Sequence, residues 1–278
     1  MAIFYWAGGD DGPPDNWDNG LNWRKNEALN EATAGSDDFP KNSYDIAVIP
    51  PQGSYFNIAT LGANRTIAAF IDLNNGTCRF EAVDFTLTVG SASFLGASSN
   101  NSGKITGGCT FSGVASRNNT GGTVTGGCIF DGSSYSVRNL GTVIGGCIFS
   151  GESGGAGGTI TGDCLFSGSS VRNATGIITG NCIFSGLNAR TSGGTITGDC
   201  IFNSEGSHNF GTVVGTCVFS VTSDGNSNSG TITGNAIFHN GTGLSNTGTI
   251  SGVLVPLVPI TNTGTAGSLP VDALIAGI

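Results

Sequence analysis

A short sequence word recurs at a nearly constant interval, and this repeat limits the fold more than any other feature of the chain. Seven cysteines follow one another at steps of 19, 19, 17, 18, 18 and 17 residues, and Ala236 takes the next position 19 residues later. So regular a repeat predicts units that stack, because one unit cannot bury its own apolar side chains. A phenylalanine lies two residues after each position: Cys109, Cys128, Cys147, Cys164, Cys182, Cys200, Cys217 and Ala236 precede Phe111, Phe130, Phe149, Phe166, Phe184, Phe202, Phe219 and Phe238.

The repeated word reads Gly-Thr-Ile-Thr-Gly-x-Cys-Ile-Phe-Ser-Gly, and it favours short strands separated by bends. Thr-Ile-Thr and Cys-Ile-Phe suit strands whose side chains alternate between two faces, while glycine lets the backbone turn. The 48 glycines disfavour helices, and all eight prolines lie outside residues 52–255, as expected where every strand is hydrogen-bonded on both sides. We therefore predict an all-β protein, a single-stranded, right-handed parallel β-helix with coils of about 18 residues.

The Cys-Ile-Phe strand predicts one apolar row inside the coils and another outside. If cysteine and phenylalanine point into the lumen as a core ladder, the aliphatic residue between them points outward; the reverse orientation places phenylalanine outside. A continuous outer aliphatic row is a candidate contact surface, for example for a second copy of the chain. This row consists of Ile129, Ile148, Leu165, Ile183, Ile201, Val218 and Ile237.

The eight cysteines admit three interpretations. Metal binding favours close Cys-x-x-Cys pairs, and the chain has none. Disulfides between neighbouring coils are sterically feasible, but the chain starts without a signal-peptide pattern, which favours a reducing compartment. We expect the cysteines to be reduced and to pack as small hydrophobic residues, as Ala236 must in the same position.

The two ends differ from the repeat in composition. Residues 1–60 hold all three tryptophans and five of the eight prolines, and we expect them to cap the open strand edges or to attach the chain elsewhere. Residues 61–252 are expected to form the β-helix, with regular coils from about residue 103, and residues 253–278 an extended apolar tail. Four acidic residues near the start could hold Ca²⁺, although their spacing matches no known calcium loop: Asp10, Asp11, Asp15 and Asp18.

Arginine recurs on the third, polar side of the coil. Arg117, Arg172 and Arg190 each lie eight residues after the cysteine of their coil, and Arg138 lies ten residues after Cys128. Guanidinium groups in such a row can bind acidic sugars or phosphates through paired hydrogen bonds. The alternative is that they only keep a weakly charged surface soluble.

The signs of catalysis are weak. Asp163 and Asp199 lie two coils apart, roughly 9.6 Å, near the upper limit for an inverting glycosidase pair, but Gly-Asp is also ordinary turn chemistry. His208 and His239 lie on separate coils without a matching nucleophile. We therefore expect no catalytic residues and no bound metal, and keep a polysaccharide lyase or hydrolase as an alternative.

Charge and hydropathy exclude other partners. The formal net charge is −9, with 10 basic against 19 acidic residues, which argues against nucleic acid. The longest apolar run, residues 253–260, is too short to span a bilayer. Rows of Thr-x-Thr, such as Thr195 and Thr197, resemble those of ice-binding solenoids, but Ile144, Ile177 and Val214 interrupt them.

The segment from Asn16 to Trp23, the Asp-x-Ala-x-Ile-Pro segment from Asp45 to Pro50, and the repeated coils resemble parallel β-helix adhesins and phage appendage proteins. The resemblance implies a non-enzymatic virion protein, such as a fibre, baseplate appendage or capsid decoration, made in the host cytoplasm. Its implied partners are other virion proteins, copies of itself (a trimer among the options) and host surface polysaccharide. The alternatives are a bacterial surface adhesin, a glycan-cleaving tailspike and an ice-binding solenoid.

Overall fold

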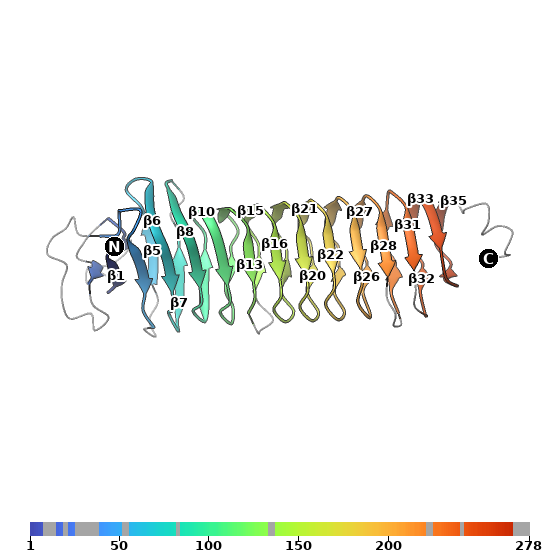
Figure 1. Ribbon diagram of the computed structural model, residues 1–278, viewed down its shortest axis with the longest axis horizontal. Coiled ribbons are helices and arrows are strands. Elements are labelled where there is room, and N and C mark those ends of the chain that lie inside the picture. Colours follow the sequence, from blue (N-terminus) through green and yellow to red (C-terminus); the bar gives the residue numbers. More distant parts are fainter. Residues whose placement is uncertain are drawn as a thin grey trace. The chain divides into compact units, whose positions relative to one another are not determined.

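The computed structural model describes residues 1–7, 15–18, 22–25, 39–51, 56–81, 84–132, 137–220, 225–239 and 242–268. Its elements are all β-strands, which confirms the all-β class. They form two compact units, Met1–Gly145 and Gly146–Ile278. In both units, the strands of neighbouring coils pair in parallel and in register, at intervals of about 18 residues in the regular coils, which confirms the predicted parallel β-helix (Figure 1). At the start of the first unit, Ile3–Trp6 also pairs antiparallel with Trp23–Arg24.

The first unit begins with a cap and continues into coils. Its strands are β1 (Ile3–Trp6), β2 (Asp15–Asn16), β3 (Trp23–Arg24), β4 (Ile46–Ile49), β5 (Phe56–Thr60), β6 (Arg65–Asp72), β7 (Thr77–Phe80), β8 (Thr86–Phe94), β9 (Ser98–Asn101), β10 (Lys104–Phe111), β11 (Arg117–Asn118), β12 (Thr123–Thr125), β13 (Cys128–Phe130), β14 (Arg138–Asn139) and β15 (Thr142–Ile144). Strands β4, β6, β8 and β10 form one parallel sheet, and β5, β7, β9, β11 and β14 form a second.

The second unit repeats a coil of three short strands. Two strands of each coil join one sheet and the third joins another, and all pairings are parallel. The strands are β16 (Cys147–Phe149), β17 (Gly155–Ala156), β18 (Thr159–Thr161), β19 (Cys164–Phe166), β20 (Arg172–Asn173), β21 (Ile177–Thr179), β22 (Cys182–Phe184), β23 (Arg190–Thr191), β24 (Thr195–Thr197), β25 (Cys200–Phe202), β26 (His208–Asn209), β27 (Thr212–Val214), β28 (Cys217–Ser220), β29 (Ser227–Asn228), β30 (Thr231–Ile232), β31 (Ala236–His239), β32 (Ser245–Asn246), β33 (Thr249–Pro256), β34 (Thr261–Asn262) and β35 (Thr265–Ser268).

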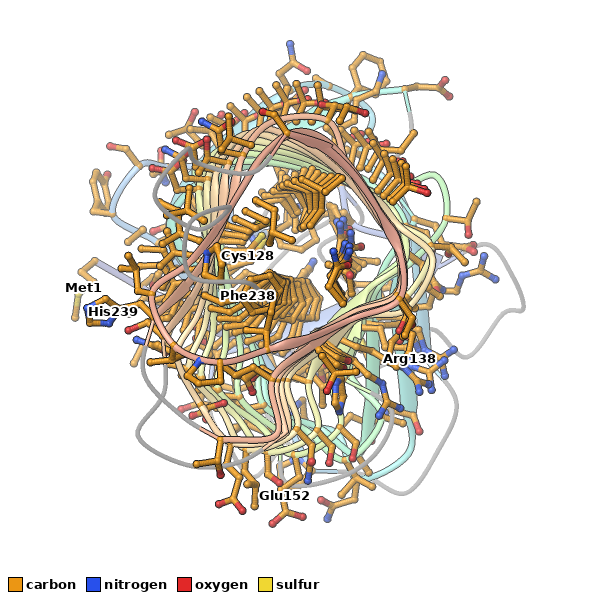
Figure 2. The ribbon with its side chains drawn as sticks, turned by 90° about the vertical axis from the view of Figure 1, so that its right-hand side faces the viewer. Met1, Cys128, Arg138, Glu152, Phe238 and His239 are labelled. Atoms are coloured by element: carbon orange, nitrogen blue, oxygen red, sulfur yellow. The ribbon has the colours of Figure 1, made fainter. Side chains whose placement is uncertain are left out.

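Cysteine and phenylalanine point into the coils, as Cys128 and Phe238 show (Figure 2). The cysteines are all buried and none forms a disulfide. In the second unit the phenylalanine rings stack almost parallel, with centroids 4.5 Å apart between Phe166 and Phe184 and 5.0 Å apart between Phe202 and Phe219. Each ring from Phe166 to Phe219 therefore has a ring on either side, which is possible only if the coils stay in register.

Glycine is required where the first strand of a coil bends into the second. Gly180 adopts a φ of 154°, and a Cβ there would collide with the carbonyl oxygen of Gly162 in the preceding coil. Gly198 repeats this arrangement against Gly180. The backbones of neighbouring coils thus approach closely at the invariant glycine of the repeat, because glycine has no side chain to keep them apart.

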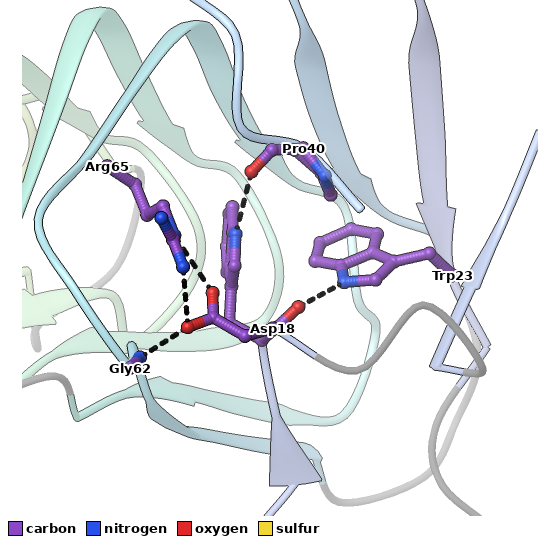
Figure 3. Close-up of polar contacts among 6 residues, drawn as sticks. Asp18, Trp23, Pro40, Gly62 and Arg65 are labelled. Atoms are coloured by element: carbon purple, nitrogen blue, oxygen red, sulfur yellow. Dashed lines mark hydrogen bonds and ion pairs between the residues drawn. The ribbon is translucent and has the colours of Figure 1, made fainter. Parts of the chain in front are cut away.

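Aromatic side chains close the first unit at its start. Trp6, Trp17 and Trp23 are fully buried, and the ring of Trp23 lies 4.8 Å from each of the other two. Trp17 Nε1 donates to the carbonyl of Pro40 at 3.0 Å, and Trp23 Nε1 donates to the carbonyl of Trp17 at 2.8 Å (Figure 3). The predicted tryptophan-rich cap is therefore a packed cluster in the described part of this segment.

A buried carboxyl interrupts the phenylalanine row of the first unit. Asp72 pairs in register with Phe94, so it occupies the phenylalanine position of its own coil. It is fully buried; Oδ1 accepts from the Asn74 amide at 3.0 Å, while Oδ2 has no hydrogen-bond partner. Burial raises the pKa of Asp72 above its ordinary value of 3.8.

Asp72→Asn is expected to stabilise the chain at neutral pH. Because the folded-state pKa is raised, the ionised carboxyl destabilises the fold, and this penalty develops as pH rises from 3.8 through the raised pKa. The free energy of unfolding of the variant should exceed that of the parent chain by about 1–3 kcal/mol at pH 7. Below pH 3.8 the two values should be nearly equal. Urea unfolding of both proteins across this pH range measures the difference; a difference independent of pH would contradict the assignment.

Candidate functional site

The third strand of a regular coil has two residues, of which the first points outward and the second points inward. This strand positions the arginines. In β11, β14 and β20 the arginine points outward and the asparagine that follows it is fully buried. Figure 2 shows Arg138 directed away from the coils. The arginine is thus held by a backbone whose next side chain is anchored in the core.

The buried asparagines form a hydrogen-bonded row, here called the asparagine ladder. In the first unit, Asn101 Nδ2 donates to Asn118 Oδ1 and Asn118 Nδ2 donates to Asn139 Oδ1, both at 2.9 Å. In the second unit, Asn209 donates to Asn228 at 2.7 Å and Asn228 donates to Asn246 at 2.8 Å. Asn118 and Asn228 each accept one such bond and donate another, so the ladder satisfies polar groups that would otherwise be costly to bury.

The asparagine ladder has a gap in the second unit. Asn173 is fully buried, yet neither its Oδ1 nor its Nδ2 has a hydrogen-bond partner. Its neighbours in register are Ala156, which has no polar side-chain atom, and Thr191, whose hydroxyl bonds to Asn209. Asn173 therefore bears the cost of burial without the bonds that its counterparts make.

The arginines stand in register on the outer side of the same strands. We call them the arginine row: Arg117 pairs with Arg138 in the first unit, and Arg172 pairs with Arg190 in the second. Arg79 occupies the same column of the first unit, separated from Arg117 by Asn100. Chain positions beyond Lys104 contain no other lysine or arginine, so the positive charge of that part of the sequence is confined to this row.

Two like charges directly opposite each other on neighbouring strands repel. Among the described residues, neither Arg172 nor Arg190 forms an ion pair with an acid, and Arg190 Nε donates only to Ser192 Oγ at 3.3 Å. In the first unit, the Nε of Arg117 is buried without a hydrogen-bond partner. Arg172 and Arg190 therefore keep unused hydrogen-bonding capacity for an anion.

His208 continues the arginine row in the second unit. It pairs in register with Arg190, and its Nδ1 lies 2.8 Å from Ser227 Oγ. Burial, and next the positive charge of Arg190, lower the pKa of His208 below its ordinary value of 6.5. The imidazole is therefore neutral at pH 7 and leaves the charge of the row to the two arginines.

The candidate acidic pair serves the corner between the first and second strands. Asp163 Oδ1 accepts from the Asn181 amide at 2.7 Å, Asn181 Oδ1 accepts from the Asp199 amide at 2.9 Å, and Asp199 Oδ1 accepts from the Thr216 amide at 2.8 Å. Asn235 does the same for Val253. An Asp carboxylate and an Asn amide accept the same backbone hydrogen bond at this corner. This role is turn formation and does not require catalysis.

Asp199→Ala is expected to lower the free energy of unfolding by about 1 kcal/mol, because the exposed Thr216 amide loses its acceptor. Asp199→Asn keeps an acceptor oxygen in the same position and should unfold like the parent chain. Urea unfolding curves of the two variants measure this contrast. Equal losses would show that the negative charge, rather than the hydrogen bond, is what this corner needs.

The outer aliphatic row faces outward, as expected from the orientation in which cysteine and phenylalanine point into the lumen. Ile129 is 41% exposed in the first unit, and Ile183 and Ile201 are 39% and 38% exposed in the second. The Thr-x-Thr rows also point outward, and Ile177 and Val214 hold threonine positions in register with Thr195 and Thr197. The aliphatic row and the threonine rows are both regular, and the described residues of the chain leave both of them at least partly exposed.

The candidate calcium ligands are only partly described. Asp10 and Asp11 lie outside the described residues, and for Asp15 only the backbone is described. Asp18 forms an ion pair with Arg65 at 2.8 Å and accepts from the Gly62 amide at 2.6 Å (Figure 3). Among the described residues, no group of three or more His, Cys, Asp or Glu side chains is arranged to hold a metal ion.

No protein-family model matches the chain, and neither the curated proteins nor the solved structures show a significant match. The fold and the rows described above are thus the whole basis for a function. The described part of the chain contains no helix that is both long and apolar enough to cross a membrane.

The asparagine ladder was not anticipated from the sequence, although a signal for it is present. Arginine is followed by asparagine in three of the four coils first noted for their arginines, and Asn209, Asn228, Asn246 and Asn262 keep the same place in coils without arginine. A polar residue at a constant position beside a variable one indicates an inward side chain that bonds to its own copies.

Proposed function

We propose that this chain is a non-enzymatic structural and attachment protein of a phage particle. The observation that carries the proposal is the contrast between a constant interior and a variable outer side. Phenylalanine, cysteine and asparagine fill the interior coil after coil, while the third side carries arginine, histidine or serine. Such units are rigid scaffolds that present chosen side chains at fixed spacing, which is what an attachment protein needs.

Phage particles purified from the producing host test this role. An antibody against the chain should label the particles in electron micrographs, and the purified protein should release no new reducing ends from host polysaccharide. Labelling of the bacterial surface instead of particles would favour the alternative, a bacterial adhesin. Release of reducing ends would overturn the non-enzymatic assignment and favour a glycan-cleaving tailspike.

The outer aliphatic row would serve assembly with further copies of the chain, a trimer among them. Ile183→Lys together with Ile201→Lys places two charges on this row of the second unit, and we expect it to shift the solution mass towards that of a monomer. Ser185→Lys with Asn203→Lys adds the same charge beside the row as a control. Light scattering after size-exclusion chromatography measures the mass; a monomeric parent chain would contradict this role of the row.

A further inference from the structure

We propose that the arginine row of each unit binds a linear anionic polysaccharide laid along successive coils. The proposal names the ligand class of the attachment role, and to that extent it rests on the proposed function. Its basis is placement within each unit. Arg79, Arg117 and Arg138 occupy one column of the first unit, where Arg79 is already ion-paired with Glu81 at 2.6 Å, and Arg172 pairs in register with Arg190 in the second unit. These five are half of the 10 basic residues of the chain.

Spacing favours a polymer over a small anion. Successive coils of the second unit are separated by the distance between stacked rings, 4.5 Å from Phe166 to Phe184 and 4.7 Å from Phe184 to Phe202. Guanidinium groups repeated at this interval match anionic groups repeated along a chain. Each contact is a charge-assisted, paired hydrogen bond, and the ligand also removes the repulsion between neighbouring arginines.

The side chains are prepared for such contacts. Arg117, Arg172 and Arg190 are half-buried, so part of their conformational freedom is already lost before a ligand arrives. The adjoining asparagine or threonine of each strand is fully buried and fixes the backbone beneath them. A polysaccharide, rather than a nucleic acid, is the anionic polymer that the proposed attachment role requires, so single-stranded DNA serves as the competing probe in the test.

Dextran sulfate and polygalacturonate are suitable probes, with neutral dextran as the blank, and calorimetry measures their affinity for the full chain. We expect binding of at least one anionic probe, weakened about tenfold or more by Arg172→Ala with Arg190→Ala and again by Arg117→Ala with Arg138→Ala. Lys41→Ala with Lys104→Ala removes the same charge elsewhere and should change affinity less than about twofold. Unfolding curves establish that each variant is folded.

The two histidines of the chain report where the probe binds. The NMR signals of His208, which adjoins Arg190, should shift on titration, whereas those of His239, which lies in the other sheet of the second unit, should not. Absence of binding to both anionic probes, equal loss in the lysine control, or tighter binding of single-stranded DNA than of either polysaccharide would overturn the proposal. Binding through the arginines by a protein that labels no particle would overturn the phage role and leave this inference standing.

Discussion

Phe184→Ala is expected to lower the free energy of unfolding by about 3–5 kcal/mol. Phe184 is fully buried, with ring centroids 4.5 Å from Phe166 and 4.7 Å from Phe202. Truncation removes its apolar surface from the core and leaves two rings facing a void, because neighbouring coils are fixed by their own backbone hydrogen bonds and cannot close it. The loss therefore falls at the upper end of what single substitutions cause.

Two further variants make this prediction selective. Phe210→Ala removes a ring that is 47% exposed in the same unit, and it should change the free energy of unfolding by less than about 1 kcal/mol. Phe184→Leu keeps an apolar side chain and should fall between the two. Urea unfolding followed by circular dichroism measures all three. Similar values for Phe184→Ala and Phe210→Ala would mean that the phenylalanine row is not interior.

Asn228→Ala is expected to be more costly than the same change at Asn173, although both side chains are fully buried in the same unit. Removal of Asn228 deprives Asn209 of its acceptor and Asn246 of its donor. Two buried polar groups then remain unsatisfied, which lowers the free energy of unfolding by about 2–4 kcal/mol. Asn173 makes no side-chain hydrogen bond, so its replacement should cost less than about 1 kcal/mol.

Thr191→Asn offers the complementary test, because it supplies the missing amide between Asn173 and Asn209. We expect it to raise the free energy of unfolding by about 1 kcal/mol. Urea unfolding compares the three variants under one condition. If Asn173→Ala and Asn228→Ala were equally costly, the hydrogen bonds of the ladder would not be what stabilises it.

Much of the fold can be predicted from the sequence because every regular coil must fill the same inward positions with the same kind of side chain. Phe166, Phe184 and Phe202 each meet a copy of themselves, so one good residue is selected repeatedly and the period becomes visible. Asp72 shows the limit of this signal. It holds a phenylalanine position in an irregular early coil, and only the pairing with Phe94 reveals that its carboxyl is buried.

The candidate site was predictable in part for a related reason. The arginine positions follow from their distance to the cysteine, but their side-by-side placement depends on where each loop lets the third strand begin. Arg138 lies ten residues after Cys128 rather than eight, yet it pairs in register with Arg117, which the spacing alone does not predict. The inward asparagines could not be predicted in the same way, because the sequence does not show which face of the two-residue third strand is buried.

Hydrogen-bond couplings in NMR spectra test the parallel register most directly. In the structure the amides of Cys164, Cys182 and Cys200 donate to the carbonyls of Asn181, Asp199 and Thr216, each at 2.9 Å. Through-bond couplings between these amide nitrogens and carbonyl carbons are expected in a deuterated sample. Couplings that instead join these cysteines to antiparallel partners, or to no residue of a neighbouring coil, would contradict the stacked coils on which the arginine row depends.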